Sequence, residues 1–338
     1  MPRVKAPANL PLLVKQTFAK ALTDKELHHF PTQVTVLPVD TIPFQLRFSP
    51  SLANKPKGPA PDPAKPSKPF DPFENPPPGL FVTDLGPFHF LVLNKFAVVP
   101  EHFILATREY KLQTHVLEEP DLEATLACIQ AYEEASLSQD RDEAASAAEG
   151  LYAFFNCGEH SGASQPHRHI QLLPVAKMRE GLEAGSAWEV LADRLHTDKA
   201  PFWTFSEKIS LDISGKDLYA TYLRLYRQAC RAVATHQGAS SATADAPSKG
   251  EARISYNLAM TKSTLVVCPR LAEGAKIMSN EGDILGSLAL NGTLLAGTAL
   301  VKNELEWEAL KGDPAGLLRV LKGIGIPRDA ALEEGGKL

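Results

Sequence analysis

The chain has 338 residues, of which 44% are hydrophobic and 22% are charged, and its formal net charge is −5 at pH 7. This composition is typical of a globular protein with one or two closely packed domains. The negative net charge argues against a general nucleic-acid-binding surface, because a phosphate backbone requires concentrated basic residues. No apolar run reaches the length of about 18 residues that a membrane helix needs, so we expect no contact with a membrane.

In the first third of the chain, the pattern predicts one helix, several strands and a long loop. Apolar residues recur at helical spacing over residues 10–27, which predicts an amphipathic helix. Residues 50–79 are rich in proline, which cannot donate to a sheet ladder, so they are expected to form a surface loop. The strands predicted in this part are residues 34–37, 44–48, 80–83, 88–93 and 103–107.

The rest of the chain alternates between predicted helices and strands. We expect helices at 121–137, 178–195 and 218–235, and strands at 151–155, 202–205, 253–258 and 263–267. The long apolar stretch at residues 285–301 is interpreted as one buried helix. Strands followed by helices and again by strands predict an α+β fold, with an antiparallel sheet flanked by helices.

The four cysteines are far apart in the sequence and form no C-x-x-C pair. This usage favours reduced, buried thiols over a disulfide framework or a structural zinc site. The first residues lack the apolar core of a signal peptide. We therefore expect a cytoplasmic protein that could also be nuclear.

Residues 156–174 contain the pattern on which the functional prediction depends. A loop of small and polar residues leads to His167, His169 and Gln171, which are spaced two apart. In a strand, side chains alternate between two faces, so these three share one face and the residues between them point to the other. An isolated H-x-H pair is more often a surface strand or a metal-binding pair, but the preceding polar loop favours a catalytic site.

The string of residues 162–171, Gly-Ala-Ser-Gln-Pro-His-Arg-His-Ile-Gln, resembles the active-site strand of the histidine-triad superfamily. With glutamine in the third place, it is similar to the branch of galactose-1-phosphate uridylyltransferases and fungal diadenosine tetraphosphate (Ap4A) phosphorylases. The resemblance covers residues 46–307 and implies a histidine-triad-like sheet of the uridylyltransferase type. We expect residues 1–200 to form a nucleotidyltransferase part, and residues 201–338 to pack on it and complete the substrate site.

The resemblance implies that His169 is the nucleophile on an α-phosphorus, with His167 and Gln171 as further catalytic residues. Imidazole suits this role, because its neutral form is abundant near pH 7. A carbonyl near His167 is the expected partner of the other ring nitrogen of His169, fixing its tautomer. Gln171 can donate to a phosphoryl oxygen but cannot shuttle a proton, which favours transfer to phosphate over hydrolysis. We expect the reacting nitrogen to face an open cleft.

The expected substrate-binding residues come from several segments. Residues 162–165 resemble a phosphate-binding loop, in which glycine permits close approach of the backbone. Lysines would offset the charge of a polyphosphate, and Lys57 is the alternative to Lys55. The resemblance implies most of the others, although Thr298 stands where the family has methionine, and His102 is expected only to anchor a turn. The complete set is Lys55, Asn94, Lys95, Asn156, Gly162, Ala163, Ser164, Gln165, Gln171, Asn291, Gly292, Thr293, Thr298 and Lys302.

The activity that the resemblance implies is phosphorolysis of Ap4A to ATP and ADP through AMP bound to His169. ADP sulfurylase activity would use the same intermediate. The alternatives are a dinucleoside polyphosphate hydrolase or a uridylyltransferase of the same superfamily, and a non-catalytic nucleotide-binding protein. Expected ligands are Ap4A, other dinucleoside polyphosphates, ATP, ADP, AMP and phosphate. A divalent cation, Mg²⁺ or Mn²⁺, would be bound through the polyphosphate, and we expect a monomer.

Overall fold

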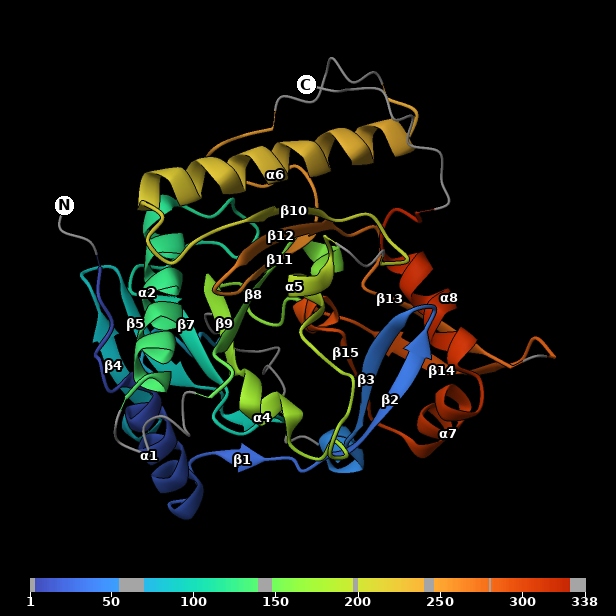
Figure 1. Cartoon of the computed structure of the whole chain (residues 1–338), viewed down its shortest axis with the longest axis horizontal. Helices are drawn as coiled ribbons and strands as arrows, with labels where there is room; N and C mark the ends of the chain where they lie inside the picture. The colour runs from blue at the N-terminus through green and yellow to red at the C-terminus, as the bar shows by residue number, and fades with distance from the viewer. Residues whose placement is uncertain are drawn as a thin grey trace, which may run out of the picture.

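A computed structural model describes residues 4–54, 70–138, 148–196, 200–239, 246–279 and 281–328. Its main feature is an eight-stranded antiparallel sheet with the order β10-β12-β11-β8-β9-β7-β5-β4 (Figure 1). The strands are β4 (Phe81–Leu85), β5 (His89–Leu93), β7 (Phe103–Thr107), β8 (Leu151–Cys157), β9 (His169–Pro174), β10 (Phe205–Lys208), β11 (Tyr256–Met260) and β12 (Thr264–Pro269). The strand with the central motif, β9, therefore lies inside the sheet.

Strand β8 shows how the sheet separates two hydrophobic cores. Phe155 and Cys157 contact one core, whereas Tyr152 and Phe154 contact the other. Because both faces are covered, every residue of β8 is buried. This burial explains the continuous apolar run that predicted the strand.

Three long helices cover the first face of the sheet: α1 (Leu10–Thr23), α2 (Glu119–Ser136) and α6 (Gly215–His236). In Figure 1, α6 runs along β10 and β12. On α1, the buried side chains of Leu10, Val14 and Phe18 are four residues apart, so they form one apolar stripe.

Smaller elements enclose the second core, on the side of Figure 1 away from α1 and α2. Strands β15, β3 and β2 form a three-stranded sheet, β13 and β14 form a hairpin, and β1 pairs with β6. Their bounds are β1 (His28–His29), β2 (Gln33–Val39), β3 (Ile42–Phe48), β6 (Phe96–Ala97), β13 (Gly274–Met278), β14 (Ile284–Ala289) and β15 (Thr298–Val301). The remaining α-helices are α4 (Val175–Arg179), α5 (Leu191–Arg194), α7 (Glu304–Gly312) and α8 (Pro314–Ile324).

The structure confirms the α+β fold, the helices near 10–27, 121–137 and 218–235, and most of the predicted strands. The strand expected at 202–205 begins only at Phe205. Of the expected loop at 50–79, residues 55–69 lie outside the described part of the chain.

The interpretation of residues 285–301 as one helix is wrong. The stretch contains most of β14, a 3-10 turn (η5, Gly292–Ala296) and β15. Gly297 has a φ of 70°, a left-handed conformation that ends the turn. Strand β15 then pairs in parallel with β3 and is mostly buried. Buried parallel strands are apolar throughout, so their pattern resembles that of a buried helix.

The prediction of one helix at 178–195 is also wrong. The structure has two short helices there, α4 and α5, separated by an irregular segment. Gly181 and Gly185 lie in this segment with φ values of 88° and 81°, which a right-handed helix does not contain. Between the two short helices, Trp188 is buried, and its indole N–H donates to the carbonyl of Gly297 at 3.0 Å.

The eight-stranded sheet takes β10, β11 and β12 from beyond residue 200 and its other strands from before it. The two expected parts therefore share one sheet, and a boundary at residue 200 stays a prediction. Within the described residues, no helix has the length and apolarity needed to cross a membrane.

Candidate active site

The loop between β8 and β9 requires glycine at two positions. Gly158 has a φ of 85°, and a β-carbon there would lie 2.5 Å from Oγ of Ser255. Gly162 has a φ of 77°, and a β-carbon there would lie 2.8 Å from the carbonyl oxygen of Leu290. Both the conformation and the lack of space favour glycine. The tight packing at Gly162 places this loop against the segment that follows β14.

His169, the first residue of β9, is anchored through one ring nitrogen. Its Nδ1 lies 2.8 Å from the carbonyl oxygen of His167, which can only accept, so Nδ1 carries the proton. The expected partner of this nitrogen is therefore confirmed. Burial lowers the pKa of His169 to about 4, so the ring is neutral at pH 7. No described residue hydrogen-bonds to Nε2, so the lone pair of this atom is available to act as a nucleophile.

The imidazole of His169 is covered, which corrects our expectation of an open cleft. Only 2% of the residue is exposed, and the ring of Phe73 lies over it with centroids 5.2 Å apart. Phe73 belongs to residues 70–74, here called the covering segment, which follows the proline-rich stretch. The ring of His169 is therefore covered by a segment that lies outside the sheet.

His167 precedes β9 and shares a face with His169, as predicted, because both rings contact Phe73. Its Nδ1 lies 2.8 Å from a carboxylate oxygen of Asp71, and its Nε2 lies 2.9 Å from the carbonyl oxygen of Thr107. Both ring nitrogens are thus engaged. The backbone carbonyl of His167 accepts the hydrogen bond that orients the ring of His169.

Gln171 is oriented by a directional chain of hydrogen bonds. The N–H of Phe96 donates to Oδ1 of Asn94 at 3.0 Å, so Nδ2 is the Asn94 atom that faces Nδ1 of His102, at 3.1 Å. Nε2 of His102 then donates to Oε1 of Gln171 at 2.6 Å. Burial lowers the pKa of His102 to about 4, which keeps the ring neutral. The amide N–H group of Gln171 is left for another acceptor, and His102 therefore does more than anchor a turn.

Asn156, near the end of β8, is oriented in a similar way. Its Oδ1 accepts from the N–H of Gly292 at 2.8 Å and from Nδ2 of Asn257 at 2.9 Å. Asn257 also donates to the carbonyl of Ser161 and accepts from Arg270, which fixes its own amide. Both partners of the Asn156 side chain use its oxygen, so among the described residues nothing accepts from its N–H group, which could bind a ligand. The structure thus brings Asn156 next to residues 291–293, one of the segments expected to bind substrate.

The other expected residues from this part of the site differ in their surroundings. Ser164 is exposed and Gln165 is half-buried, and neither side chain has a hydrogen-bond partner among the described residues. The hydroxyl of Thr293 donates to Oδ1 of Asn291 at 2.9 Å. This bond stabilises the start of the 3-10 turn η5. Thr298 is buried in β15 and donates to Gln45, so its observed contact is structural.

Among the described residues, no contact joins the expected lysine side chains to His169. Lys95 and Lys302 are exposed, whereas Lys55 and its alternative Lys57 lie outside the described residues. Within the described ranges there is no group of three or more His, Cys, Asp or Glu side chains that could hold a metal ion.

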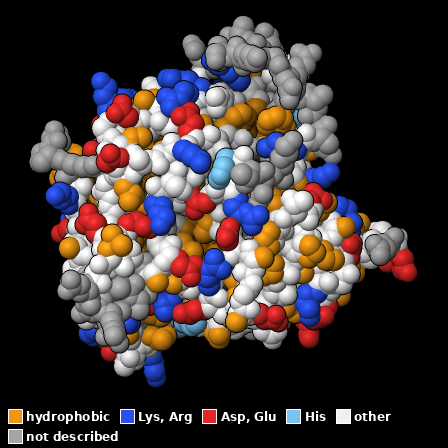
Figure 2. Space-filling view, viewed as in Figure 1, with side chains coloured by type: hydrophobic (Ala, Val, Ile, Leu, Met, Phe, Trp, Pro, Cys, Tyr) orange, Lys and Arg blue, Asp and Glu red, His pale blue; other side chains and the backbone are white. Residues whose placement is uncertain are grey.

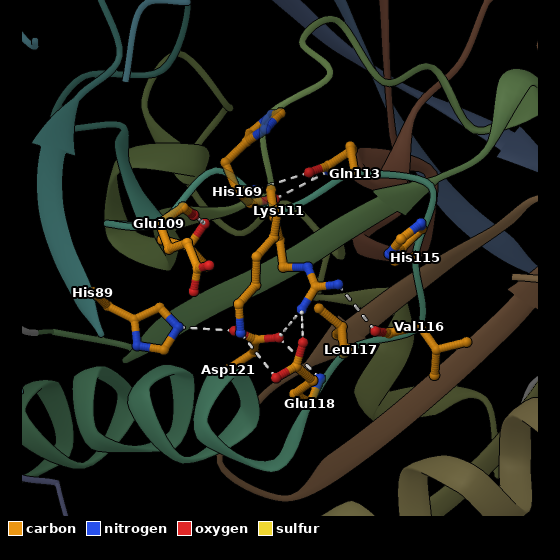
Figure 3. Close-up of polar contacts among 12 residues, drawn as sticks. His89, Glu109, Lys111, Gln113, His115, Val116, Leu117, Glu118, Asp121 and His169 are labelled. Carbon is orange, nitrogen blue, oxygen red and sulfur yellow. Dashed lines mark hydrogen bonds and ion pairs between the residues drawn. The ribbon is translucent and has the colours of Figure 1, made fainter. Parts of the chain in front are cut away.

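On the opposite face, where the chain enters β9, a charge network joins the buried Arg168 and Asp121 to the half-buried Glu118. Arg168, between the two histidines, lies 2.9 Å from Asp121 and 3.0 Å from Glu118. Figure 3 shows Asp121 and Glu118 with His89, whose Nε2 lies 2.8 Å from Asp121. Burial alone would raise the pKa of Asp121, but His89 and Arg168 hold it below its usual value. Arg168 therefore points away from the face that carries His167 and His169, as the strand period predicted.

Four further residues of the site are not among those predicted from the sequence: Asp71, Phe73, Gln113 and Asn257. Asn257 carried a signal, because it interrupts a run of apolar residues in a strand that is buried along its whole length. A polar side chain at such a position must find hydrogen-bond partners. The other three come from loops, where a polar or aromatic residue is not unusual.

Together, the fold and the site define a class of enzyme. A neutral imidazole with one nitrogen anchored suits covalent catalysis, and the amide N–H groups of Asn156 and Gln171 suit an anionic substrate. These features suit an enzyme that transfers a phosphate-containing group.

Comparison with known proteins identifies the family. Residues 2–185 match the model of the Ap4A phosphorylase N-terminal domain, and residues 198–327 match that of the ATP adenylyltransferase C-terminal domain. The chain therefore belongs to the Ap4A phosphorylase family of nucleotidyltransferases.

Two relatives from Saccharomyces cerevisiae cover most of the chain. Diadenosine 5',5'''-P1,P4-tetraphosphate phosphorylase 2 is 33% identical over 309 residues, which are 87% of this chain and 86% of that protein. Protein APA1 is 26% identical over 348 residues, 95% of each chain. The crystal structure of yeast Ap4A phosphorylase Apa2 matches with a TM-score of 0.69 and 27% identity, covering 94% of this chain and 98% of that one. Structures of Apa2 with AMP and with Ap4A match with the same TM-score.

The cover over His169 can be tested by chemical modification. Phe73→Ala is expected to increase the rate at which diethyl pyrocarbonate modifies His169 several-fold, because it removes the ring above the imidazole. Peptide mapping by mass spectrometry gives the rate at this residue. Phe70→Ala is the matched control, since Phe70 belongs to the same segment but is 84% exposed. Equal rates in the Phe73 variant and the unsubstituted protein would contradict this role for Phe73.

Proposed function

We propose that this protein is an Ap4A phosphorylase, which converts Ap4A and phosphate to ATP and ADP. The observation that carries the proposal is the hydrogen bond between Nδ1 of His169 and the carbonyl of His167, which leaves a neutral Nε2 as the nucleophile. The family supports it, because a relative 33% identical to this chain is named as a phosphorylase of Ap4A, and Apa2 has been solved with Ap4A.

In the first half-reaction, Nε2 of His169 attacks an α-phosphorus of Ap4A. A bond forms between nitrogen and phosphorus, the bond from phosphorus to the bridging oxygen breaks, and ATP leaves. AMP is now attached to the ring, which has gained positive charge. The Nδ1–H group stays bonded to the carbonyl oxygen of His167, so this charge is shared with an acceptor that is already in position.

In the second half-reaction, an oxygen of inorganic phosphate attacks the same phosphorus. The nitrogen–phosphorus bond breaks, ADP leaves, and His169 returns to its neutral form. The amide of Gln171 does not act as an acid or a base, so it could not take a proton from an attacking water molecule. This favours phosphate as the acceptor. The N–H groups of Gln171 and Asn156 would bind phosphoryl oxygens as their charge rises. ADP sulfurylase activity would use sulfate as the acceptor.

The charge of the polyphosphate also needs cations. We propose Lys55, Lys95 and Lys302 for this role, together with Mg²⁺ or Mn²⁺ carried by the polyphosphate itself. Substrate would reach His169 when the ring of Phe73 leaves its place, because this ring occupies the space above the imidazole.

We also propose that the protein is located in the cytoplasm, with the nucleus as a further option, because all four cysteines are buried free thiols and both compartments keep thiols reduced. A monomer would suffice, since a single chain assembles the described site.

The covalent intermediate is tested by mixing the protein with Ap4A in phosphate-free buffer. Mass spectrometry is expected to find one AMP on His169, and none in His169→Asn. His236→Asn, at the exposed end of α6, is the control and keeps the adduct. Added phosphate should then release ADP, with ATP and ADP in equal amounts overall.

Other products would indicate the alternatives. Release of AMP and ATP without phosphate would show a hydrolase, and transfer from a uridine nucleotide in preference to Ap4A would show a uridylyltransferase. A protein that binds Ap4A and forms neither adduct nor product would be a non-catalytic nucleotide-binding protein.

The pH dependence of the first half-reaction follows from the lowered pKa of His169. The neutral ring is the nucleophile, so the single-turnover rate constant for adduct formation should be constant between about pH 5.5 and 8. It should fall only as the pH approaches the pKa of about 4, where the ring becomes protonated. Rapid mixing across this range measures the profile. A loss of rate centred on the ordinary pKa of histidine would contradict the effect of burial.

A further inference from the structure

Gln113 lies in the segment that leads from β7 to α2, and only 2% of it is exposed. Its backbone N–H donates to the carbonyl of Pro166 at 2.7 Å, and the N–H of Arg168 donates to the carbonyl of Lys111 at 2.7 Å. This segment therefore runs beside the residues that enter β9. Figure 3 shows the side chain of Gln113 directed at His169.

The side chain of Gln113 occupies the place where the β8–β9 ladder stops. The two strands pair from Leu151 with Pro174 as far as Phe154 with Gln171. Two residues further along this register, Asn156 would face His169, but no such pair forms.

The carboxamide of Gln113 lies between these two residues and makes three hydrogen bonds with their backbones. Its Oε1 accepts from the N–H of His169 at 2.8 Å, and its Nε2 lies 3.1 Å from the carbonyl of the same residue. The same Nε2 donates to the carbonyl of Asn156 at 2.8 Å. A single amide thus takes over hydrogen bonds that the neighbouring strand would otherwise make.

We propose that Gln113 is a positioning residue for the transfer reaction, which sets the place of the His169 backbone relative to that of Asn156. The inference rests on the proposed function, in which His169 attacks phosphorus and Asn156 binds the phosphoryl group. With the backbone held by Gln113 and Nδ1 held by His167, the ring of His169 has little freedom to turn away from the phosphorus. The carboxamide itself contacts only backbone groups among the described residues and takes no part in bond making.

The chemistry of the site requires glutamine. The three bonds need one acceptor and donors on the same planar group, which a carboxamide provides. A glutamate of the same length would face the carbonyl oxygens of Asn156 and His169 with a carboxylate that only accepts. Leucine or methionine would fill the space and make none of the three bonds.

The test separates binding from the chemical step. In Gln113→Met and Gln113→Glu, the single-turnover rate of AMP transfer to His169 should fall by about 100-fold, as expected when a reacting group is misplaced by a small distance. The Kd for Ap4A, measured by calorimetry, should change by less than about threefold, because the side chain of Gln113 is bonded to backbone groups of the protein and not directed at the proposed substrate.

Gln130→Met is the matched control, because the side chain of Gln130 on α2 also donates to a backbone carbonyl, that of Leu211, away from β9. It should lower thermal stability comparably and leave the rate of AMP transfer unchanged. A Gln113→Met protein that transfers AMP at the normal rate would overturn the inference. So would equal losses of rate in the two methionine variants.

A second readout needs no reaction and distinguishes this inference from the proposed function. In ¹⁵N NMR of histidine-labelled protein, His169 is expected to be a single tautomer with the proton on Nδ1. Gln113→Met should give a mixture of tautomers, and Gln130→Met should not. If the unsubstituted protein formed no AMP adduct, the proposed function would fail, whereas an unchanged tautomer in Gln113→Met would refute the positioning role itself.

Discussion

The site depends on the 2.8 Å hydrogen bond between Nδ1 of His169 and the carbonyl oxygen of His167. The bond joins two residues of one short segment, so it needs a fixed backbone more than a distant partner. The site also needs a neutral imidazole, and burial provides it by lowering the pKa of His169. Arg168, bonded to Asp121 and Glu118 on the opposite face, keeps the same backbone from rotating. The central position of β9 in the sheet and the ion pairs of Arg168 thus both fix the position of the His169 imidazole.

The second feature of the site is the direction of its amides. His102 occupies the oxygen of Gln171, and Gly292 with Asn257 occupies the oxygen of Asn156, so both side chains are left with N–H donors. This arrangement suits a phosphate-containing ligand without a strongly basic surface. It is also compatible with the net charge of −5, since donors fixed by a network can bind an anion locally.

The sequence could predict the parts of the site that depend on local pattern. The spacing of His167, His169 and Gln171 placed them on one strand face, and residues 88–93 and 103–107 alternate or run apolar as strands do. It could not predict that Phe73 covers His169, since their contact joins residues far apart in the chain with no pattern between them. Apolar content alone also failed for residues 285–301, because a buried parallel strand and a buried helix look alike until a partner strand is known.

The most direct test of the account is the identity of the nitrogen that carries AMP. The adenylylated protein, labelled with ¹⁵N in its histidines, can be examined by NMR for coupling between ³¹P and the ring nitrogens. Phosphorus is expected to be bonded to Nε2 of His169, with the proton still on Nδ1. Phosphorus bonded to Nδ1, or to any other residue, would contradict the account.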